Sequence, residues 1–228
     1  MSRFSEMSKE EKTKRLIMTI GGVVTCGISV GLYKLAAFGV DPFQVLLAGF
    51  AKCAEAIPLE FGLVSILLNV AMLFFSFFAD RHYIGIATFI NLLFFGYIVQ
   101  YSLAFFQMLM PGIGIPGRIV CFIIAIVVMC FGSAMYFTSD LGVSTYDAVS
   151  LIIVNTWHKG KFQYVRIISD CCCVIGGVLL LVACKLPWTK IIESAGIGTI
   201  VTAFFMGPLI EFFNVKIARP FLYGKNGK

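Results

Sequence analysis

Two four-residue motifs in this chain carry side chains that could bind a ligand. Asp41-Pro42-Phe43-Gln44 and Ser144-Thr145-Tyr146-Asp147 each follow a long apolar run and a Gly-Val pair. An Asp or Ser cap with a polar residue three positions later is typical of a helix start, and Pro fits the first helical position. The free amide groups at such a start can hold an anionic or carbonyl group. The alternative is that each side chain only caps its own helix.

An ionisable side chain inside an apolar segment is a second candidate for chemistry. Asp170 lies within such a run, and aligning residues 61–66 with 162–167 places it opposite Asn69. Charged groups at membrane depth are costly and commonly functional. Arg166, four residues earlier on the same helical face, could instead simply neutralise Asp170. The substrate-binding residues that we predict are Asp41, Gln44, Asn69, Ser144, Thr145, Asp147 and Asp170.

A further set of matching residues is predicted to serve the fold. Glycines precede both motifs and permit a turn there, because glycine adopts a positive φ at little cost. Gly85-Ile86-Ala87-Thr88 also returns as Gly196-Ile197-Gly198-Thr199, followed each time by another glycine. Small residues and hydroxyls let membrane helices approach closely. The structural set is Gly39, Pro42, Thr88, Gly96, Gly142, Thr199 and Gly207, of which the two threonines are secondary candidates for a polar cavity.

The paired motifs indicate a duplicated chain, and its composition indicates a membrane protein. Self-similarity at a fixed spacing is the mark of a repeated architecture. Hydrophobic residues make up 59% of the 228 residues, with 23 Phe and only 13% charged residues. The mean hydropathy is +0.94. Such values lie far from those of soluble domains, so we predict an all-α polytopic membrane protein.

The apolar runs predict about six transmembrane helices, since a span needs roughly 20 apolar residues. The predicted spans are 16–38, 61–79, 84–107, 117–139, 162–184 and 190–213. Two shorter apolar segments, 42–55 and 145–157, suit re-entrant or interfacial half-helices. The membrane domain thus covers residues 16–213, with tails at 1–15 and 214–228. Its first repeat is 16–107 and its second is 117–213.

The distribution of Lys and Arg predicts the orientation by the positive-inside rule. With the N-terminus cytoplasmic, the inner side collects Arg3, Lys9, Lys12, Lys14, Arg15, Arg81, Lys159, Lys161, Arg166, Lys216, Arg219, Lys225 and Lys228. The outer side has Lys52, Arg118, Lys185 and Lys190. Both termini are therefore expected in the cytoplasm, and the net charge of +6 needs no nucleic-acid partner. Three spans per half make the repeats inverted, as in many secondary transporters; structural duplication without transport is the alternative.

The Gly-Val motifs and the segment of residues 196–211 resemble the YczE/YyaS/YitT family of bacterial membrane proteins. The resemblance covers about residues 16–213 and is better in the second half. It implies a small polytopic protein of the cytoplasmic membrane whose molecular activity is generally unassigned. The acidic residue usual after the aromatic is Asp147 in the second motif but Gln44 in the first.

Other chemistries lack their residues, so we expect no enzyme, cofactor or metal site. His82 and His158 lie in loops, and no G-x-S-x-G is present, which disfavours an intramembrane serine hydrolase. Asp147 with Asp170 is a weak match to a pair of facing catalytic carboxylates. The cysteines fall mainly in apolar runs and are read as reduced thiols.

The leading hypothesis for function is a small-solute permease or channel with its site between the repeats. The first alternative is a non-catalytic accessory or substrate-binding subunit that needs a partner complex, such as the six-helix component of an energy-coupled uptake system. The second is an assembly or signalling protein that transports nothing. The expected partners are the lipid bilayer and a small solute, with a homo-oligomer left open.

Overall fold

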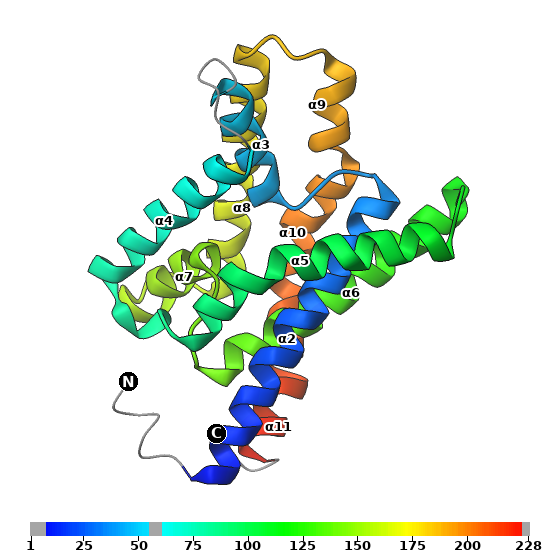
Figure 1. The fold of residues 1–228 in the computed structure, drawn as a ribbon. Helices are drawn as coiled ribbons and strands as arrows, with labels where there is room; N and C mark the ends of the chain where they lie inside the picture. The colour runs from blue at the N-terminus through cyan, green and yellow to red at the C-terminus, as the bar shows by residue number, and fades with distance from the viewer. Residues whose placement is uncertain (1–7, 55–60, 225–228) are drawn as a thin grey trace.

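The computed structural model describes residues 8–54 and 61–224, and every regular element in these ranges is helical (Figure 1). The first half contains α2 (Lys9–Ala36), α3 (Pro42–Ala54), α4 (Phe61–Ala79), η1 (Arg81–Tyr83) and α5 (Ile86–Leu109). The second contains α6 (Ile115–Ser139), α7 (Thr145–Leu151), η2 (Ile152–Thr156), α8 (Phe162–Ala183), α9 (Trp188–Ser194), α10 (Ile197–Phe213), η3 (Asn214–Ala218) and α11 (Arg219–Tyr223). Each half therefore begins with a long helix, a short helix and a second long helix, and the second half ends with the additional segments η3 and α11.

The first long helices of the two halves, α2 and α6, pack against each other in antiparallel directions. Ser29 Oγ donates to Ala125 O over 2.6 Å, while nearer the other end Thr19 Oγ1 donates to Ser139 Oγ over 2.8 Å. A Cβ on Gly22 would lie 2.7 Å from the carbonyl oxygen of Gly132. Because this glycine has no side chain, the two backbones approach closely at the centre of the pair.

An arginine at the start of each of these helices caps the end of the other. Arg15 of α2 donates to Ser139 O over 2.8 Å. Arg118 of α6 donates to Ala36 O over 2.7 Å and to Ala37 O over 3.0 Å. A cation at a helix C-terminus satisfies unpaired carbonyl groups and faces the negative end of the helix dipole. The same electrostatic contact is thus made twice, once at each end of the pair.

The short helices exchange between the halves. Helix α3 packs on α8, and α7 packs on α4. A Cβ on Gly49 of α3 would lie 2.8 Å from Gly177 O of α8, so the backbones are in direct contact there. On the other side, Thr145 Oγ1 of α7 donates to Asn69 Oδ1 of α4 over 2.7 Å. Each half therefore holds the half-helix of the other.

The turn before each short helix is built in the same way. Gly39 has φ +120° and Gly142 has φ +101°, values that favour glycine. Thr199 Oγ1 donates to Val40 O, and Thr88 Oγ1 donates to Val143 O, both over 2.7 Å. Each threonine thereby ties the turn of one half to the last long helix of the other. A buried polar group in lipid needs such a partner.

Five helical segments are long and apolar enough to cross a membrane. They are Lys9–Ala36, Ile86–Leu109, Ile115–Ser139, Phe162–Ala183 and Trp188–Tyr223. The remaining predicted span, 61–79, forms α4. Within the residues that the structure describes, its apolar part Ile66–Ala79 is shorter than those five segments. The first helix also begins at Lys9 rather than at 16, because Ser8 caps it through Glu11 N. The last predicted span, 190–213, is broken between α9 and α10 at Ala195 and Gly196.

Candidate functional site

A cavity of about 350 Å³ lies where the short helices of the two halves meet. We call it the Asp41 cavity. Its wall contains six of the seven residues predicted to bind substrate, namely Asp41, Gln44, Asn69, Ser144, Thr145 and Asp147. Its other polar or charged lining residues are Lys34, Asn91, Ser133, Tyr136, Tyr146 and Arg166. The seventh predicted residue, Asp170, is fully buried behind this wall, where it contacts Tyr146 and Arg166.

The two predicted helix starts face each other across this cavity. The ring of Phe43 stacks on that of Tyr146, with centroids 5.0 Å apart and an interplanar angle of 19°. These aromatic residues hold equivalent positions in the two motifs. The duplicated motif therefore forms one site from two sequence-distant segments.

Both helix starts are capped from within their own motifs. Asp41 Oδ1 accepts from Phe43 N over 2.9 Å. Ser144 Oγ accepts from Asp147 N over 3.1 Å. Side-chain caps of this kind satisfy amide groups that would otherwise be open to an anion. The geometry follows the capping alternative more closely than the anion-binding one.

A buried arginine organises the charge beside the cavity. Arg166 is 3% exposed and forms ion pairs with Asp147 and Asp170, the latter with its Nε 3.3 Å from the carboxylate. The hydroxyl of Tyr136 donates to Asp147 and that of Tyr146 donates to Asp170. The guanidinium also lies 4.6 Å from the centroid of the Tyr146 ring. Both carboxylates are thus paired with a single cation, whose fork can serve two partners.

This arrangement changes the role expected for Arg166. The charge distribution places it among the inner-surface anchors, whereas the structure buries it in an ion-pair network. Arg166 and Asp170 are four residues apart, so they share a face of their helix, and this spacing explains their ion pair. The added partner Asp147 comes from another helix, and only the packing of α7 on α8 brings it there.

Gly96 and Gly207, which we expected as helix contacts, lie in different surroundings. A Cβ on Gly207 would lie 3.0 Å from Gln163 O of α8, a close helix approach. A Cβ on Gly96 would meet no atom within 4 Å, and Gly96 instead lines the Asp41 cavity. Helix α5 packs mainly on α2, so its glycine is left facing open space.

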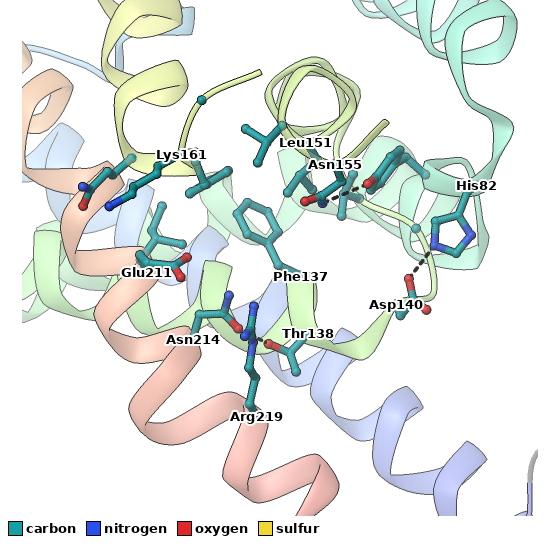
Figure 2. A pocket seen from close by; sticks show the side chains of 18 of the residues that line it. His82, Phe137, Thr138, Asp140, Leu151, Asn155, Lys161, Glu211, Asn214 and Arg219 are labelled. Atoms are coloured by element: carbon teal, nitrogen blue, oxygen red, sulfur yellow. Dashed lines mark hydrogen bonds and ion pairs between the residues drawn. The ribbon is translucent and has the colours of Figure 1, made fainter. Parts of the chain in front are cut away.

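A larger cavity, of about 910 Å³, lies beside η1, η2 and the end of α10 (Figure 2). We call it the His82 cavity. Figure 2 shows His82 pointing at Asp140, with Nε2 2.8 Å from Oδ1, and Thr138 Oγ1 donating to Asn214 Oδ1 over 2.8 Å. Asn155 Nδ2 donates to the Tyr83 hydroxyl over 3.0 Å, and burial raises the pKa of that phenol, so it stays protonated. Lys161, Glu211 and Arg219 also line this space.

A thin wall separates the two cavities. Tyr136 lines the Asp41 cavity, and the next residue, Phe137, lines the His82 cavity. On α8, Gln163 lines the His82 cavity and Arg166 lines the Asp41 cavity. These positions are less than one helical turn apart, which is about 5.4 Å along the axis. Arg166 and Asp147, which form an ion pair, both line the Asp41 cavity.

Comparison with known proteins gives a family but no activity. A family described as "Family of unknown function (DUF6198)" matches residues 13–215. The chain belongs to this family. An "Uncharacterized protein" of Haemophilus influenzae is 26% identical over 194 residues, which cover 85% of this chain and 80% of that protein. No solved structure matches the chain.

These matches leave the resemblance to the YczE/YyaS/YitT family as a prediction, since neither description names it. A family of unknown function agrees with the expected lack of an assigned activity. Membership extends over nearly all of the predicted membrane domain, so both halves and the Asp41 cavity belong to the shared part. Function must consequently be argued from the site.

Proposed function

We propose that this protein is a small-solute permease of a bacterial cytoplasmic membrane, with its solute site in the Asp41 cavity. The observation that carries the proposal is the thin wall between two cavities, together with the buried ion pair of Arg166 and Asp147 that lines the Asp41 cavity. Ionisable groups inside membrane proteins commonly mark solute pathways. Opening this wall would join the two spaces into one route.

The arrangement of the halves supports an inverted repeat. Equivalent helices α2 and α6 run antiparallel, and equivalent arginines cap opposite ends of the pair. The half-helices exchange between halves, as discontinuous helices do around the sites of many secondary transporters. In that architecture, rocking of one half against the other alternates access to the central site.

The positions of the ends support six crossings rather than five. Arg15 near the start of α2 donates to the Tyr223 hydroxyl of α11 over 3.3 Å, so the two ends of the helical part lie together. An odd number of crossings would put them on opposite sides. We therefore propose that α4 also crosses the membrane and that both termini are cytoplasmic, as the positive-inside rule predicts.

The charges of the cavity favour a small cation as the solute. Asp147 and Asp170 are both paired with Arg166, whereas Asp41 has no ion pair among the residues that the structure describes. The stacked rings of Phe43 and Tyr146 add π surface beside it. A carboxylate next to aromatic rings suits an organic cation. Lys34, an exposed residue that also lines the cavity, is the one lining cation besides Arg166 in the described wall.

The accessory-subunit hypothesis remains the alternative, because a binding cavity also suits a protein that delivers solute to a partner complex. In either case we propose binding without catalysis. The distinguishing observation is solute movement by the purified chain alone.

The test combines binding and flux on the purified protein. Thermal unfolding in detergent is measured with guanidinium, tetramethylammonium and putrescine as cations and with acetate and phosphate as anions, since a ligand of the native state raises the melting temperature. We expect at least one cation to stabilise the wild type and to lose this effect in Asp41→Asn. Uptake of that cation into proteoliposomes should then occur. Stabilisation without uptake would favour the accessory subunit, and stabilisation by anions alone would contradict a cation site.

A further inference from the structure

Two cysteines from different halves meet where the C-terminal ends of α3 and α8 lie together. Cys53 lies in the last turn of α3, and Cys184 caps the C-terminus of α8. Their Sγ atoms are 2.7 Å apart, slightly farther than the roughly 2.05 Å of a covalent S–S bond. Both side chains are partly exposed, so a small reagent can reach them. The other cysteines are distributed over α2, α6 and α8.

The backbone around this pair is held in place by close packing. A Cβ on Gly49 would lie 2.8 Å from Gly177 O and 2.9 Å from Leu180 Cβ. The Sγ of Cys53 also lies 3.8 Å from Leu180 O. Because α3 and α8 are in backbone contact less than two turns away, the two thiols are presented to each other by rigid elements. A disulfide forms only where the backbones already allow it.

The charge distribution indicates the compartment in which these thiols lie. Lys52 and Lys185 are the sequence neighbours of the pair, and both are on the sparsely charged side that the positive-inside rule places outside. In Figure 1 the end of α3 and helix α9 lie at one end of the molecule, and α11 lies at the other. The outside of a bacterial cytoplasmic membrane is an oxidising environment in which disulfides persist.

We propose that Cys53 and Cys184 form a redox-active dithiol that is oxidised to a disulfide on the outer face, fixing α3 to α8. The oxidant is a disulfide of a small molecule or of a protein, acting by thiol–disulfide exchange. One thiolate attacks that disulfide, giving a mixed disulfide and one released thiol. The second thiolate then attacks the mixed disulfide, forming the Cys53–Cys184 bond and releasing the second thiol. Two cysteine thiols are oxidised and one external disulfide is reduced.

The outer location rests on the orientation proposed above, but the pairing does not depend on transport. The disulfide would link α3 of the first half, which begins directly after Asp41, to the end of α8 in the second half. It would thus restrict any movement of α3 relative to α8. A modification site at this place couples the redox state outside the cell to the mobility of one cavity wall.

The test counts free thiols in the full chain. Cells are quenched in acid, and the denatured protein is tagged with a maleimide polymer that retards it on a gel. Because the disulfide joins two of the eight cysteines, we expect the wild-type chain to carry six tags before reduction and eight after. Cys53→Ala and Cys184→Ala should each give seven tags under both conditions. The matched control Cys172→Ala, an exposed residue of α8, should keep the difference of two tags.

The purified protein separates the pairing from the compartment. Treatment with oxidised glutathione should convert eight tags into six. Eight tags in cells and after glutathione would overturn the proposal. Pairing with glutathione but not in cells would overturn the outer location, and with it the orientation, while leaving the solute site untouched.

Discussion

Three buried or half-buried arginines of this protein make polar contacts that connect neighbouring helices. Arg15 and Arg118 each cap the helix on which the other lies, and Arg166 serves Asp147 and Asp170 together. In a bilayer, unpaired charges and carbonyl groups are costly, so each pairing fixes a helix in register with its neighbour. These side-chain contacts therefore determine the alignment of the two halves as well as the chemistry of the cavity.

Arg166→Gln is expected to destabilise the protein strongly. The substitution leaves two carboxylates without their cation, and removing one partner of a buried pair typically costs about 3–5 kcal/mol. The melting temperature in detergent measures the effect. The control is Arg219→Gln, an exposed arginine that lines the His82 cavity. Equal melting temperatures for the two variants would contradict a central role for the Arg166 network.

The short helices are the elements on which the site depends. Asp41 lies just before α3, which carries Gln44, and Ser144 lies just before α7, which carries Asp147. Helix α3 packs mainly on α8 and α7 mainly on α4, so each is held chiefly by the opposite half. The contact of α3 with α8 relies on two glycines, Gly49 and Gly177, whose backbones touch. Any side chain there must push the helices apart, and the wall of the Asp41 cavity would move with them.

Two glycine-to-alanine substitutions are expected to act in opposite directions. A Cβ on Gly177 would lie within van der Waals clash distance of Val45 O, so Gly177→Ala should destabilise by about 1–3 kcal/mol, as overpacking does. A Cβ on Gly21 would meet nothing within 4 Å, so Gly21→Ala should stabilise by up to about 1 kcal/mol through helix propensity. Thermal unfolding of both variants in one detergent measures the signs. Stabilisation by Gly177→Ala would contradict the close α3–α8 packing.

At the scale of the whole molecule, two matching halves enclose a polar space within an apolar exterior. Exposed large side chains such as those of Tyr97, Phe105 and Ile197 cover the outside, as expected of a surface in contact with lipid. The two cavities lie between packed helices, and exposed residues such as His82 and Lys161 line the larger one. The family match over residues 13–215 includes both halves and the lining of the Asp41 cavity.

Reporter fusions should place the termini and the α8–α9 connection on opposite sides of the membrane. Alkaline phosphatase is active only outside the cytoplasm, so a fusion after Lys185 is expected to be active. Fusions after Lys159 and at the C-terminus are expected to be inactive, because the positive-inside rule places both in the cytoplasm. An active C-terminal fusion would place the C-terminus outside the cytoplasm and would contradict the proposed orientation.

Much of the element order could be predicted from apolar periodicity and capping. The half-helix expected at 42–55 is α3 at Pro42–Ala54, and that expected at 145–157 comprises α7 and η2 up to Thr156. Boundaries were less predictable, because Ser8 extends α2 backward and the Ala195–Gly196 break divides the last segment. Both depend on local hydrogen bonds that hydropathy does not register.

The sequence alone predicted a helical membrane protein with a repeated pair of motifs, and it indicated which polar residues stand at the two helix starts. It did so because composition, repeats and caps are local properties of the chain. The packing of the helices brings Asp41 and Asn69 to one cavity and places Arg166 in its wall. It also brings Cys53 next to Cys184. These contacts join helices that are distant in sequence, and their geometry depends on how α3 packs on α8 and α7 packs on α4, which no local property of the chain encodes.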